Sequence, residues 1–475
     1  MLRSIFLILS GNAVASLMGF ARNLLVARLL GVEDYGIAST FAVSMSLIEM
    51  GTQIGLQQVI VQAREGDEPG FQAGLHGFNL LRSVAAAAVL FLLAGPIARF
   101  IGVPDLVWAY QLLALVPLLR GITHYDLHRL TRQRVYGPMM IYRAVPILIS
   151  LIAVWPLAHV FGDYQVMLYA LLVQVFLGVI VSHLMARRRY GLSFDRAVIG
   201  HAFRFGWPLL LNNILLFGVM QGDKVIVAGE LGLEVLAIFS MGLTLTMAPI
   251  GVIVQSLSLF FLPRLSQAQD DPARFAHLAR AAMQASLAAG LLLVLGVALI
   301  GGPVVHLLLG EKYAPLIPLL IWFALWQAVR GFKSGGSLAA LAQGRTKLPV
   351  LSNIVRMFLL PVAWLAAVNG ATPMQIVWIA TIGEFGAYVT ALLLLRAWLA
   401  VDLRAMAIPF MTIAIFLSVA VGQAHSLSGQ PVATPVGLLA LCLVTFAALA
   451  GMRDLRRYVP LFLRAAGWAK KETER

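Results

Sequence analysis

Charge and cysteine are scarce in this chain of 475 residues. Charged residues make up 12% of the sequence, and cysteine occurs once. The single thiol, Cys442, cannot form an internal disulfide, so redox chemistry is not indicated. The sequence also lacks a GxxxxGKS/T phosphate loop, an HExxH metal-binding pair and a GxSxG nucleophile elbow. We therefore expect no enzyme, no resident metal or cofactor, and no ATP-driven pumping by this chain alone.

Apolar residues dominate instead, at 60% of the chain. Soluble domains contain about 45–50%, so the composition predicts a polytopic membrane protein. A helix that crosses a bilayer needs about 20 residues and satisfies its backbone hydrogen bonds internally. The predicted fold is therefore all-α. Fourteen apolar segments fit: Ile5–Leu29, Gly36–Val61, Leu75–Ala98, Leu106–Tyr125, Pro138–Ala158, Gln165–Met185, Phe205–Ala228, Val235–Leu262, Ala282–Val304, Pro315–Arg330, Leu348–Val368, Gln375–Leu395, Met406–Val421 and Thr434–Ala450.

These segments predict four parts of the chain. Residues 1–190 and 200–400 contain six segments each, and we expect two six-helix lobes. Residues 401–452 contain two accessory segments without any charged residue, which we expect to pack outside the twelve-helix core. Residues 453–475 form a basic tail. The first apolar run has no cleavage site of the signal-peptide type, so we expect it to remain as a membrane helix.

A sequence repeat relates the two lobes. The segment VARLLGVEDYGIAS, from Val26, reappears as VAGELGLEVLAIFS, from Val227, at an offset of 201 positions. The same offset places Asn12 on Asn213, and a chance match between apolar stretches is the alternative. At about 30–35 residues per helix and loop, the offset equals about six helices and keeps both copies in one orientation. Parallel repeats about an axis along the membrane normal are typical of carriers that rock two halves around a central site.

Basic residues set the expected orientation, because loops rich in lysine and arginine are retained in the cytoplasm. If the N-terminus is cytoplasmic, the lysine and arginine residues gather in the predicted inner loops. We therefore expect both termini to be cytoplasmic. The basic tail suits anionic lipid headgroups. The net charge of +14 is thus mainly an orientation signal, and no nucleic-acid partner is expected. Among the residues assigned to inner loops are Arg129, Arg187, Arg264 and Lys333.

Ionisable residues inside the predicted spans are the functional candidates, because a charge in hydrocarbon is costly unless it faces protein or water. Arg356 and Glu384 lie deepest and cannot both reach water by snorkelling. Arg82, Arg143 and Arg330 lie within about two turns of the inner surface, where snorkelling explains them. The full set is Arg22, Glu49, Arg82, Arg120, His124, Arg143, Asp223, Lys224, Arg330, Arg356 and Glu384.

One polar stripe is expected on the second helix. Glu49, Gln53, Gln57 and Gln58 follow one another at i, i+4, i+8 and i+9. Such a stripe either lines a hydrated cavity or forms hydrogen bonds between helices, and we favour the cavity.

Two further groupings are left with two interpretations each. Arg120, His124 and His128 share a helix face by i, i+4 spacing, which predicts either a polar inner vestibule or an ordinary interfacial face. Asp223 falls on Arg22 at the repeat offset, which suggests an ion pair between them across the lobe interface. That pair is either a gate or static.

A family resemblance rests on several short segments. The run RNLLVARLLGVEDYGIAS, with SLIEMGTQIGLQQVIVQ, FNLLRSV and LHRLTRQRVYGP, resembles the polysaccharide-transporter branch of the multidrug/oligosaccharidyl-lipid/polysaccharide (MOP) exporter superfamily. The second copy, GDKVIVAGELGLEVLAIFS, resembles that branch's seventh helix. The resemblance implies a two-lobe carrier that moves undecaprenyl-diphosphate-linked oligosaccharide across the bacterial inner membrane for O-antigen, capsule or exopolysaccharide synthesis. Membrane lipids and the polysaccharide polymerase machinery are the other implied partners.

The residue chemistry agrees with such a substrate. Its headgroup is anionic, and arginine offers phosphate a planar contact with several donors. We expect Arg356 to neutralise the diphosphate while the sugar occupies a hydrated, basic cavity. The predicted substrate-binding residues are Arg356, Arg22, Lys224, Arg120, Asn12 and Asn213.

Coupling and function leave alternatives open. The acids among the candidates either exchange H⁺, bind Na⁺ or are fixed counter-ions. A multidrug cation antiporter and a peptidoglycan lipid-precursor flippase of the same superfamily are rival functions, and the excess of cations within the spans argues against the antiporter. A polysaccharide polymerase or ligase is a third rival, and the short outer loops argue against it. The candidates for coupling or gating are Glu49, Asp223, Glu384 and His124.

Overall fold

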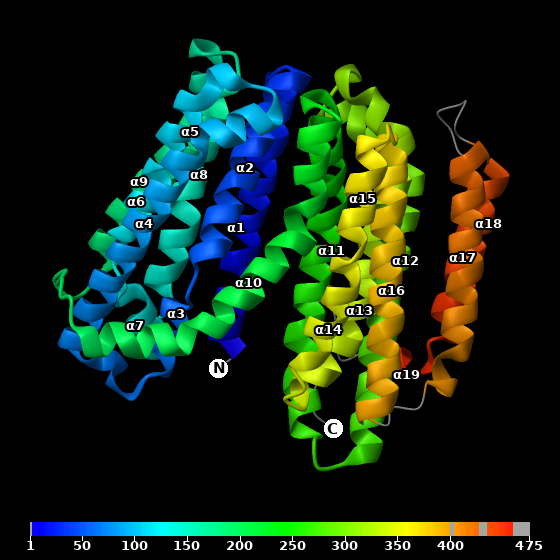
Figure 1. Cartoon of the computed structure of the whole chain (residues 1–475). Helices are drawn as coiled ribbons and strands as arrows, with labels where there is room; N and C mark the ends of the chain where they lie inside the picture. The colour runs from blue at the N-terminus through cyan, green and yellow to red at the C-terminus, as the bar shows by residue number, and fades with distance from the viewer. Residues whose placement is uncertain (1, 400–402, 427–434, 459–475) are drawn as a thin grey trace. The chain divides into compact units, whose positions relative to one another are not determined.

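The computed structural model describes residues 2–399, 403–426 and 435–458 (Figure 1). Within these ranges the regular structure is entirely helical. The chain divides into two compact units, Met1–Ser240 and Met241–Arg475.

Unit 1 is built from ten α-helices, the start of an eleventh and two short 3-10 helices in the described residues. They are α1 (Leu2–Leu29), α2 (Val32–Thr52), α3 (Leu56–Gln62), η1 (Arg64–Asp67), α4 (Pro69–Ile101), η2 (Pro104–Leu106), α5 (Val107–Leu113), α6 (Leu115–Gly121), α7 (Asp126–Arg132), α8 (Gly137–Val160), α9 (Gln165–Met185), α10 (Arg196–Glu230) and the start of α11 (Leu233–Gln267).

Unit 2 takes the remainder of α11 and the helices that follow it. They are α12 (Pro272–Leu308), η3 (Glu311–Leu316), α13 (Ile317–Ala342), α14 (Lys347–Met357), α15 (Leu359–Val368), α16 (Pro373–Leu399), η4 (Arg404–Met406), α17 (Ala407–Ser426), α18 (Pro435–Gly451) and α19 (Arg453–Arg456).

The chain is a multi-pass membrane protein. Nine helices of its described part are long and apolar enough to cross a bilayer, or ten if a pair bent by 49° forms one span. That pair joins Pro104–Gly121 to Asp126–Arg132. Each of the fourteen predicted segments overlaps a described helix or helix pair. The all-α prediction is therefore confirmed, whereas the count of fourteen spans is not.

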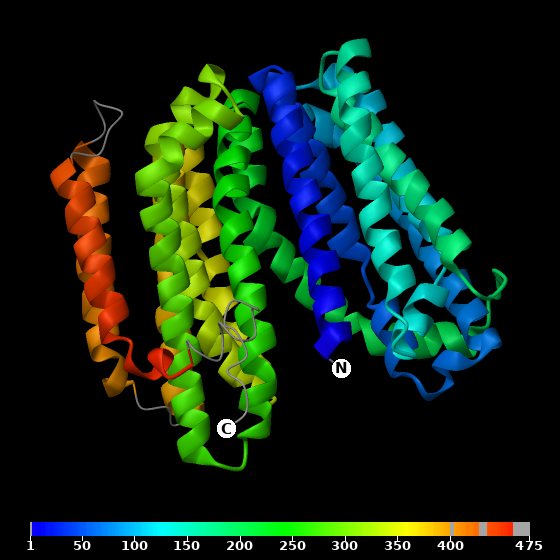
Figure 2. The same cartoon turned by 180° about the vertical axis from the view of Figure 1, so that it is seen from behind.

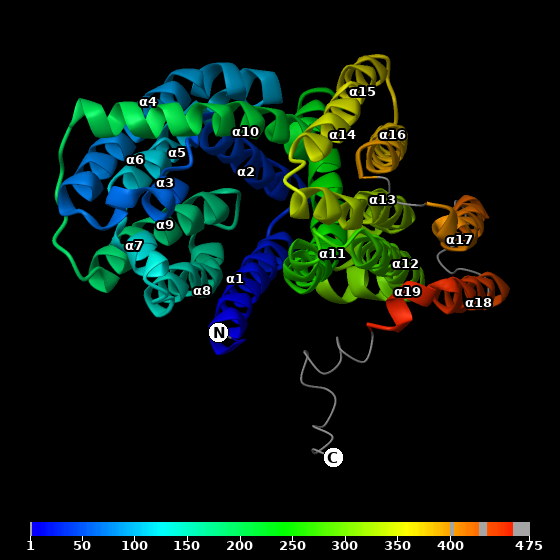
Figure 3. The same cartoon turned by 90° about the horizontal axis from the view of Figure 1, so that it is seen from below.

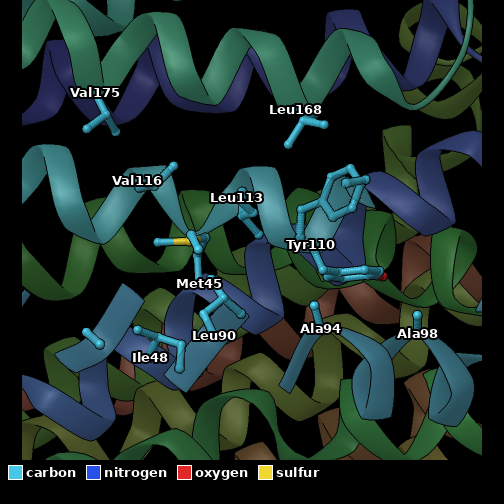
Figure 4. Packing of buried hydrophobic residues seen from close by; sticks show 14 of the residues in the cluster. Met45, Ile48, Leu90, Ala94, Ala98, Tyr110, Leu113, Val116, Leu168 and Val175 are labelled. Atoms are coloured by element: carbon cyan, nitrogen blue, oxygen red, sulfur yellow. The ribbon is translucent and has the colours of Figure 1, made fainter. Parts of the chain in front are cut away.

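The core of unit 1 lies where α2, α4, α5, α6 and α9 meet. Figure 4 shows Leu168 and Val175 of α9 pointing toward Leu113 and Val116. Tyr110 is fully buried beside them. On another side of the same unit, α1 packs along α8 (Figure 2). Lipid tails are as apolar as these side chains, so the hydrophobic effect does not drive membrane helices together. Close van der Waals packing holds them together instead.

Unit 2 is centred on α13, which packs against α12 and α16. The predicted segment Pro315–Arg330 was too short, because α13 continues to Ala342. The glycine pair Gly335 and Gly336, within this extension, serves close packing. A Cβ atom at Gly335 would lie 2.6 Å from the Ala282 carbonyl oxygen, and one at Gly336 2.5 Å from Leu395 Cδ1.

Several predicted spans are not single helices, and two helix ends affect the predicted polar groupings. α2 ends at Thr52, Gly55 adopts φ +69°, and α3 begins at Leu56. The predicted polar stripe through Gln53 is therefore wrong, because i, i+4 spacing requires one helix. α6 ends at Gly121, where Asn79 Nδ2 donates to the carbonyl oxygens of Arg120 and Gly121.

The ends of the predicted lobes do not coincide with the two units. α10 was predicted to begin the second lobe, but it packs against α2 and α4 within unit 1. It contains Pro208 and changes direction along its length (Figure 1). α17 and α18 lie at the edge of unit 2, beside α12 (Figure 3). The predicted tail falls largely in 459–475, outside the described residues.

Replacing Gly335 by alanine tests the close approach of α12 and α13. The added Cβ meets backbone atoms of Ala282 and Met283, which cannot rotate away. We expect Gly335→Ala to cost about 1–3 kcal/mol of stability, as overpacking typically does. The measurement is the thermal unfolding midpoint in detergent. Gly296→Ala on α12 is the control, because nothing lies within 4 Å of its added Cβ. Equal midpoints for the two variants would contradict this packing.

Candidate functional site

A buried basic cluster forms where α13, α14 and α16 meet in unit 2. It consists of Arg330 and Lys333 on α13, Arg356 on α14 and Glu384 on α16. Each residue is at least nine positions from the nearer end of its span. At about 1.5 Å per residue, the four side chains therefore belong to the middle of the helical bundle.

One carboxylate holds three cations in this cluster. Glu384 Oε2 lies 3.3 Å from Lys333 Nζ and accepts its hydrogen bond. Glu384 Oε1 lies 3.7 Å from Arg330 Nε and 3.8 Å from Arg356 Nε. Lys333 also donates to Asn353 Oδ1 over 2.8 Å, and the Arg356 guanidinium lies 5.7 Å above the Trp326 ring.

Burial makes the charge balance of the basic cluster important. The side chains of Arg356 and Glu384 are fully buried, and those of Arg330 and Lys333 are only 16% and 11% exposed. The cluster itself contains three cations and one acid. Removing such charges from water is costly unless an opposite charge compensates them. The arrangement therefore suits an anionic ligand that reaches the partly exposed Arg330 and Lys333.

Local sequence explains how Arg356 enters the basic cluster. Pro361 has no N–H to bond the carbonyl of Met357, and the helix breaks at Phe358, between α14 and α15. On the facing helix, a Cβ atom at Gly383 would lie only 3.0 Å from Arg356 Cδ. The glycine thus makes room for the arginine beside Glu384.

The sequence identified half of the basic cluster. It singled out Arg356 and Glu384 by depth, and the structure brings them together. It assigned Arg330 to snorkelling and Lys333 to a loop, and both assignments are wrong because α13 extends to Ala342. Their i, i+3 spacing on one helix face was the available signal.

Arg22 lies in unit 1 and has neutral partners. Its Nη1 donates to Ser150 Oγ over 3.1 Å and also to Gln174 Oε1, on α8 and α9. The predicted pair with Asp223 is not formed. Hydroxyl and amide oxygens carry dipoles and no charge, so Arg22 is a buried cation with no carboxylate partner in the described part of the chain.

Glu49 and Arg120 form an ion pair with each other. Their side chains are 37% and 43% exposed. Glu49 was a coupling candidate and Arg120 a substrate-binding candidate, and each now has the other as its partner. Gln53 lies between α2 and α3, and its backbone carbonyl oxygen accepts a hydrogen bond from Asn213 Nδ2 over 3.2 Å.

The other predicted residues are distributed over unit 1. His124 is buried in the break between α6 and α7, so it shares no helix face with Arg120. Asp223, 2% exposed, and Lys224, half-buried, are neighbours on α10. Asn12 lies on α1, and its side chain falls outside the described residues. Among the described residues predicted for binding or coupling, the structure thus brings Arg356 to Glu384 and Glu49 to Arg120.

Comparison with known proteins relates the chain to polysaccharide synthesis. A family model described as "Polysaccharide biosynthesis protein" matches residues 25–318. The amylovoran biosynthesis protein AmsL of Erwinia amylovora is 22% identical over 60% of this chain and 74% of its own length. The succinoglycan biosynthesis transport protein ExoT of Rhizobium meliloti is 24% identical over 64% of this chain and 62% of its own length.

Solved structures define the fold. The lipid II flippase MurJ, in an inward closed conformation, matches with a TM-score of 0.71 at 13% identity, over 96% of this chain and 99% of its own. An inward-facing multidrug resistance MATE family transporter of the MOP superfamily matches with a TM-score of 0.65 at 16% identity, over 81% and 94%. The chain therefore has the fold of these transporters.

Removing the carboxylate tests the electrostatic role of Glu384. Glu384→Gln removes the carboxylate that faces the three cations of the cluster, so we expect a loss of about 3–5 kcal/mol. Unfolding midpoints in detergent measure the loss. Lys333→Met added to Glu384→Gln removes one uncompensated charge and should restore part of the stability.

Glu311→Gln is the control for this prediction, because that side chain is 86% exposed and pairs with His306. An unfolding midpoint of Glu384→Gln equal to that of Glu311→Gln would mean that the cations do not depend on the carboxylate.

Proposed function

The chain belongs to the polysaccharide biosynthesis protein family, and from this premise we propose that it carries a lipid-linked oligosaccharide across a membrane. Undecaprenyl diphosphate is the proposed lipid carrier, and the bacterial inner membrane is the proposed location, with both termini in the cytoplasm. The movement is alternating access by two halves, as in carriers built from repeats.

The basic cluster is the observation that carries this proposal. A diphosphate linkage brings two or more negative charges, and the cluster has two positive charges in excess of its one carboxylate. Arg330 and Lys333 are the contact residues, because their side chains retain some exposure. Arg356 is fully buried, and it contacts Glu384 and the ring of Trp326.

The same charge balance argues against a cationic drug as substrate. A cation entering this site would meet three positive side chains and one carboxylate. The single negative charge of that carboxylate cannot balance the charges of the three side chains and the entering cation. Like charges placed together in a low-dielectric environment repel strongly. Transport of an anionic headgroup is therefore favoured over multidrug antiport.

Proton or sodium coupling is assigned to neither Glu384 nor Glu49. Three cations lie within 3.8 Å of the Glu384 carboxylate, so it acts as a fixed counter-ion. Glu49 is held by Arg120 in the same way. Both carboxylates already balance arginine or lysine, which leaves little attraction for a further cation.

Removing a contact cation should impair translocation. We expect Lys333→Ala to lower the transport rate of a diphosphate-linked oligosaccharide about 10- to 100-fold, the cost of one charged hydrogen bond at about 1.5–3 kcal/mol. The measurement is exposure of the labelled glycolipid on the far leaflet of proteoliposomes. Arg345→Ala is the control, because it removes an equal charge at an exposed position between α13 and α14. Transport by Lys333→Ala equal to that of the control would remove the basic cluster from the mechanism.

Ion gradients provide a separate prediction. If Glu49 is a fixed partner of Arg120, Glu49→Gln should leave any effect of an imposed pH or sodium gradient on transport unchanged. The ratio of rates with and without the gradient is the quantity to compare in wild-type and variant proteoliposomes. A gradient effect that is present in the wild type and lost in Glu49→Gln would assign coupling to this residue.

A further inference from the structure

A second polar site lies in unit 1, far along the chain from the basic cluster. The connection 186–195, between α9 and α10, lies directly on the start of α4, where the Ser193 N–H donates to the Ala73 carbonyl oxygen over 3.1 Å. A cavity of about 280 Å³ opens between them. Its lining residues are Pro69, Gln72, Ala73, His76, Arg188, Arg189 and Gly191.

The connection is fixed by three buried side chains. Asp126 Oδ2 accepts hydrogen bonds from the backbone N–H groups of Arg187, at 2.8 Å, and Arg188, at 3.3 Å. His124 Nε2 donates to the Arg188 carbonyl oxygen over 3.1 Å, and His76 Nδ1 donates to that of Gly191 over 2.7 Å. These hydrogen bonds thus fix the backbone that carries Arg188 and Arg189.

Both histidines are neutral in this arrangement. The remaining nitrogen of each ring accepts a backbone N–H: His76 Nε2 from Tyr125 over 3.0 Å, and His124 Nδ1 from Asp126 over 3.1 Å. A nitrogen that accepts a hydrogen bond carries no proton. The histidines therefore position the connection, and the positive charge of the cavity comes from Arg188 and Arg189.

A buried donor of the cavity has no partner among the described residues. Gln72 is 3% exposed, and its Nε2 makes no hydrogen bond, although its Oε1 accepts from Arg188 Nη1 over 3.4 Å. An unsatisfied buried amide costs about 1–3 kcal/mol, so a ligand that accepts from it would recover that loss. An anion meets this requirement.

The start of α4 adds a second attraction for an anion. Pro69 occupies the first turn of a 33-residue helix whose N-cap, Glu68, makes no side-chain cap. Free N–H groups and the helix dipole favour negative charge at such an end. No acidic side chain lines the cavity within the described part of the chain.

We propose that this cavity binds a phosphate group, through Arg188, Arg189 and the Gln72 amide. Arginine pairs with phosphate through several parallel hydrogen bonds. The group belongs either to an anionic lipid headgroup or to a soluble phosphate. The site is independent of the proposed translocation, since none of its residues belongs to the basic cluster.

Ligand-induced stabilisation tests the site in the full-length protein. The probes are inorganic phosphate in detergent, and nanodiscs of phosphatidylcholine with and without phosphatidylglycerol. Stabilisation by phosphate in detergent identifies a soluble group, and stabilisation only by phosphatidylglycerol identifies a lipid headgroup. Arg188→Gln/Arg189→Gln should lower the affinity for the stabilising probe about tenfold or more, because two charged contacts are lost. Arg196→Gln/Arg204→Gln removes the same charge from the exposed start of α10 and should behave as wild type.

Gln72→Met keeps the test decisive if the arginine variant folds poorly. It removes the unpartnered amide, so the ligand-free protein should be as stable as wild type while the probe binds more weakly. The proposal is overturned if neither probe stabilises the wild type, or if the probe stabilises Arg188→Gln/Arg189→Gln and Gln72→Met as strongly as the wild type.

Discussion

The carboxylate of Glu384 is the interaction on which the proposed mechanism depends. It is the one acid of the basic cluster, and Arg330, Lys333 and Arg356 all lie within 3.8 Å of it. Without it, three buried cations would repel one another at the middle of the bundle. With it, the site is stable yet still positively charged. The bundle thus holds three cations with fewer acids than cations in the cluster.

The two units treat buried arginine differently. In unit 2, Arg356 has a carboxylate and two neighbouring cations. In unit 1, Arg22 donates to the neutral oxygens of Ser150 and Gln174. Although the sequence repeat aligns parts of the two halves, the charged groups are not repeated with it. The two units are therefore not symmetric in charge, and the basic cluster lies in unit 2.

Much of the fold could be predicted from sequence, because apolar length alone defines membrane helices. The ends of α9 were predicted to the residue, from Gln165 to Met185. The role of a glycine is harder to predict, since it depends on what lies opposite. Gly335 and Gly336 let α13 pack closely against α12 and α16, whereas Gly55 lies at a true break just before α3. A single sequence does not contain the facing helix and cannot distinguish these cases.

Side-chain partners were harder to predict than helices. Depth in a span singled out Arg356 and Glu384, but it could not reveal that Lys333 joins them. The most direct test is binding of an undecaprenyl-diphosphate-linked oligosaccharide to the purified protein, compared with a neutral glycolipid of the same sugar. We expect the diphosphate form to bind at least about tenfold more tightly, a preference that falls in Arg330→Ala. Equal binding of the two lipids would contradict the central claim.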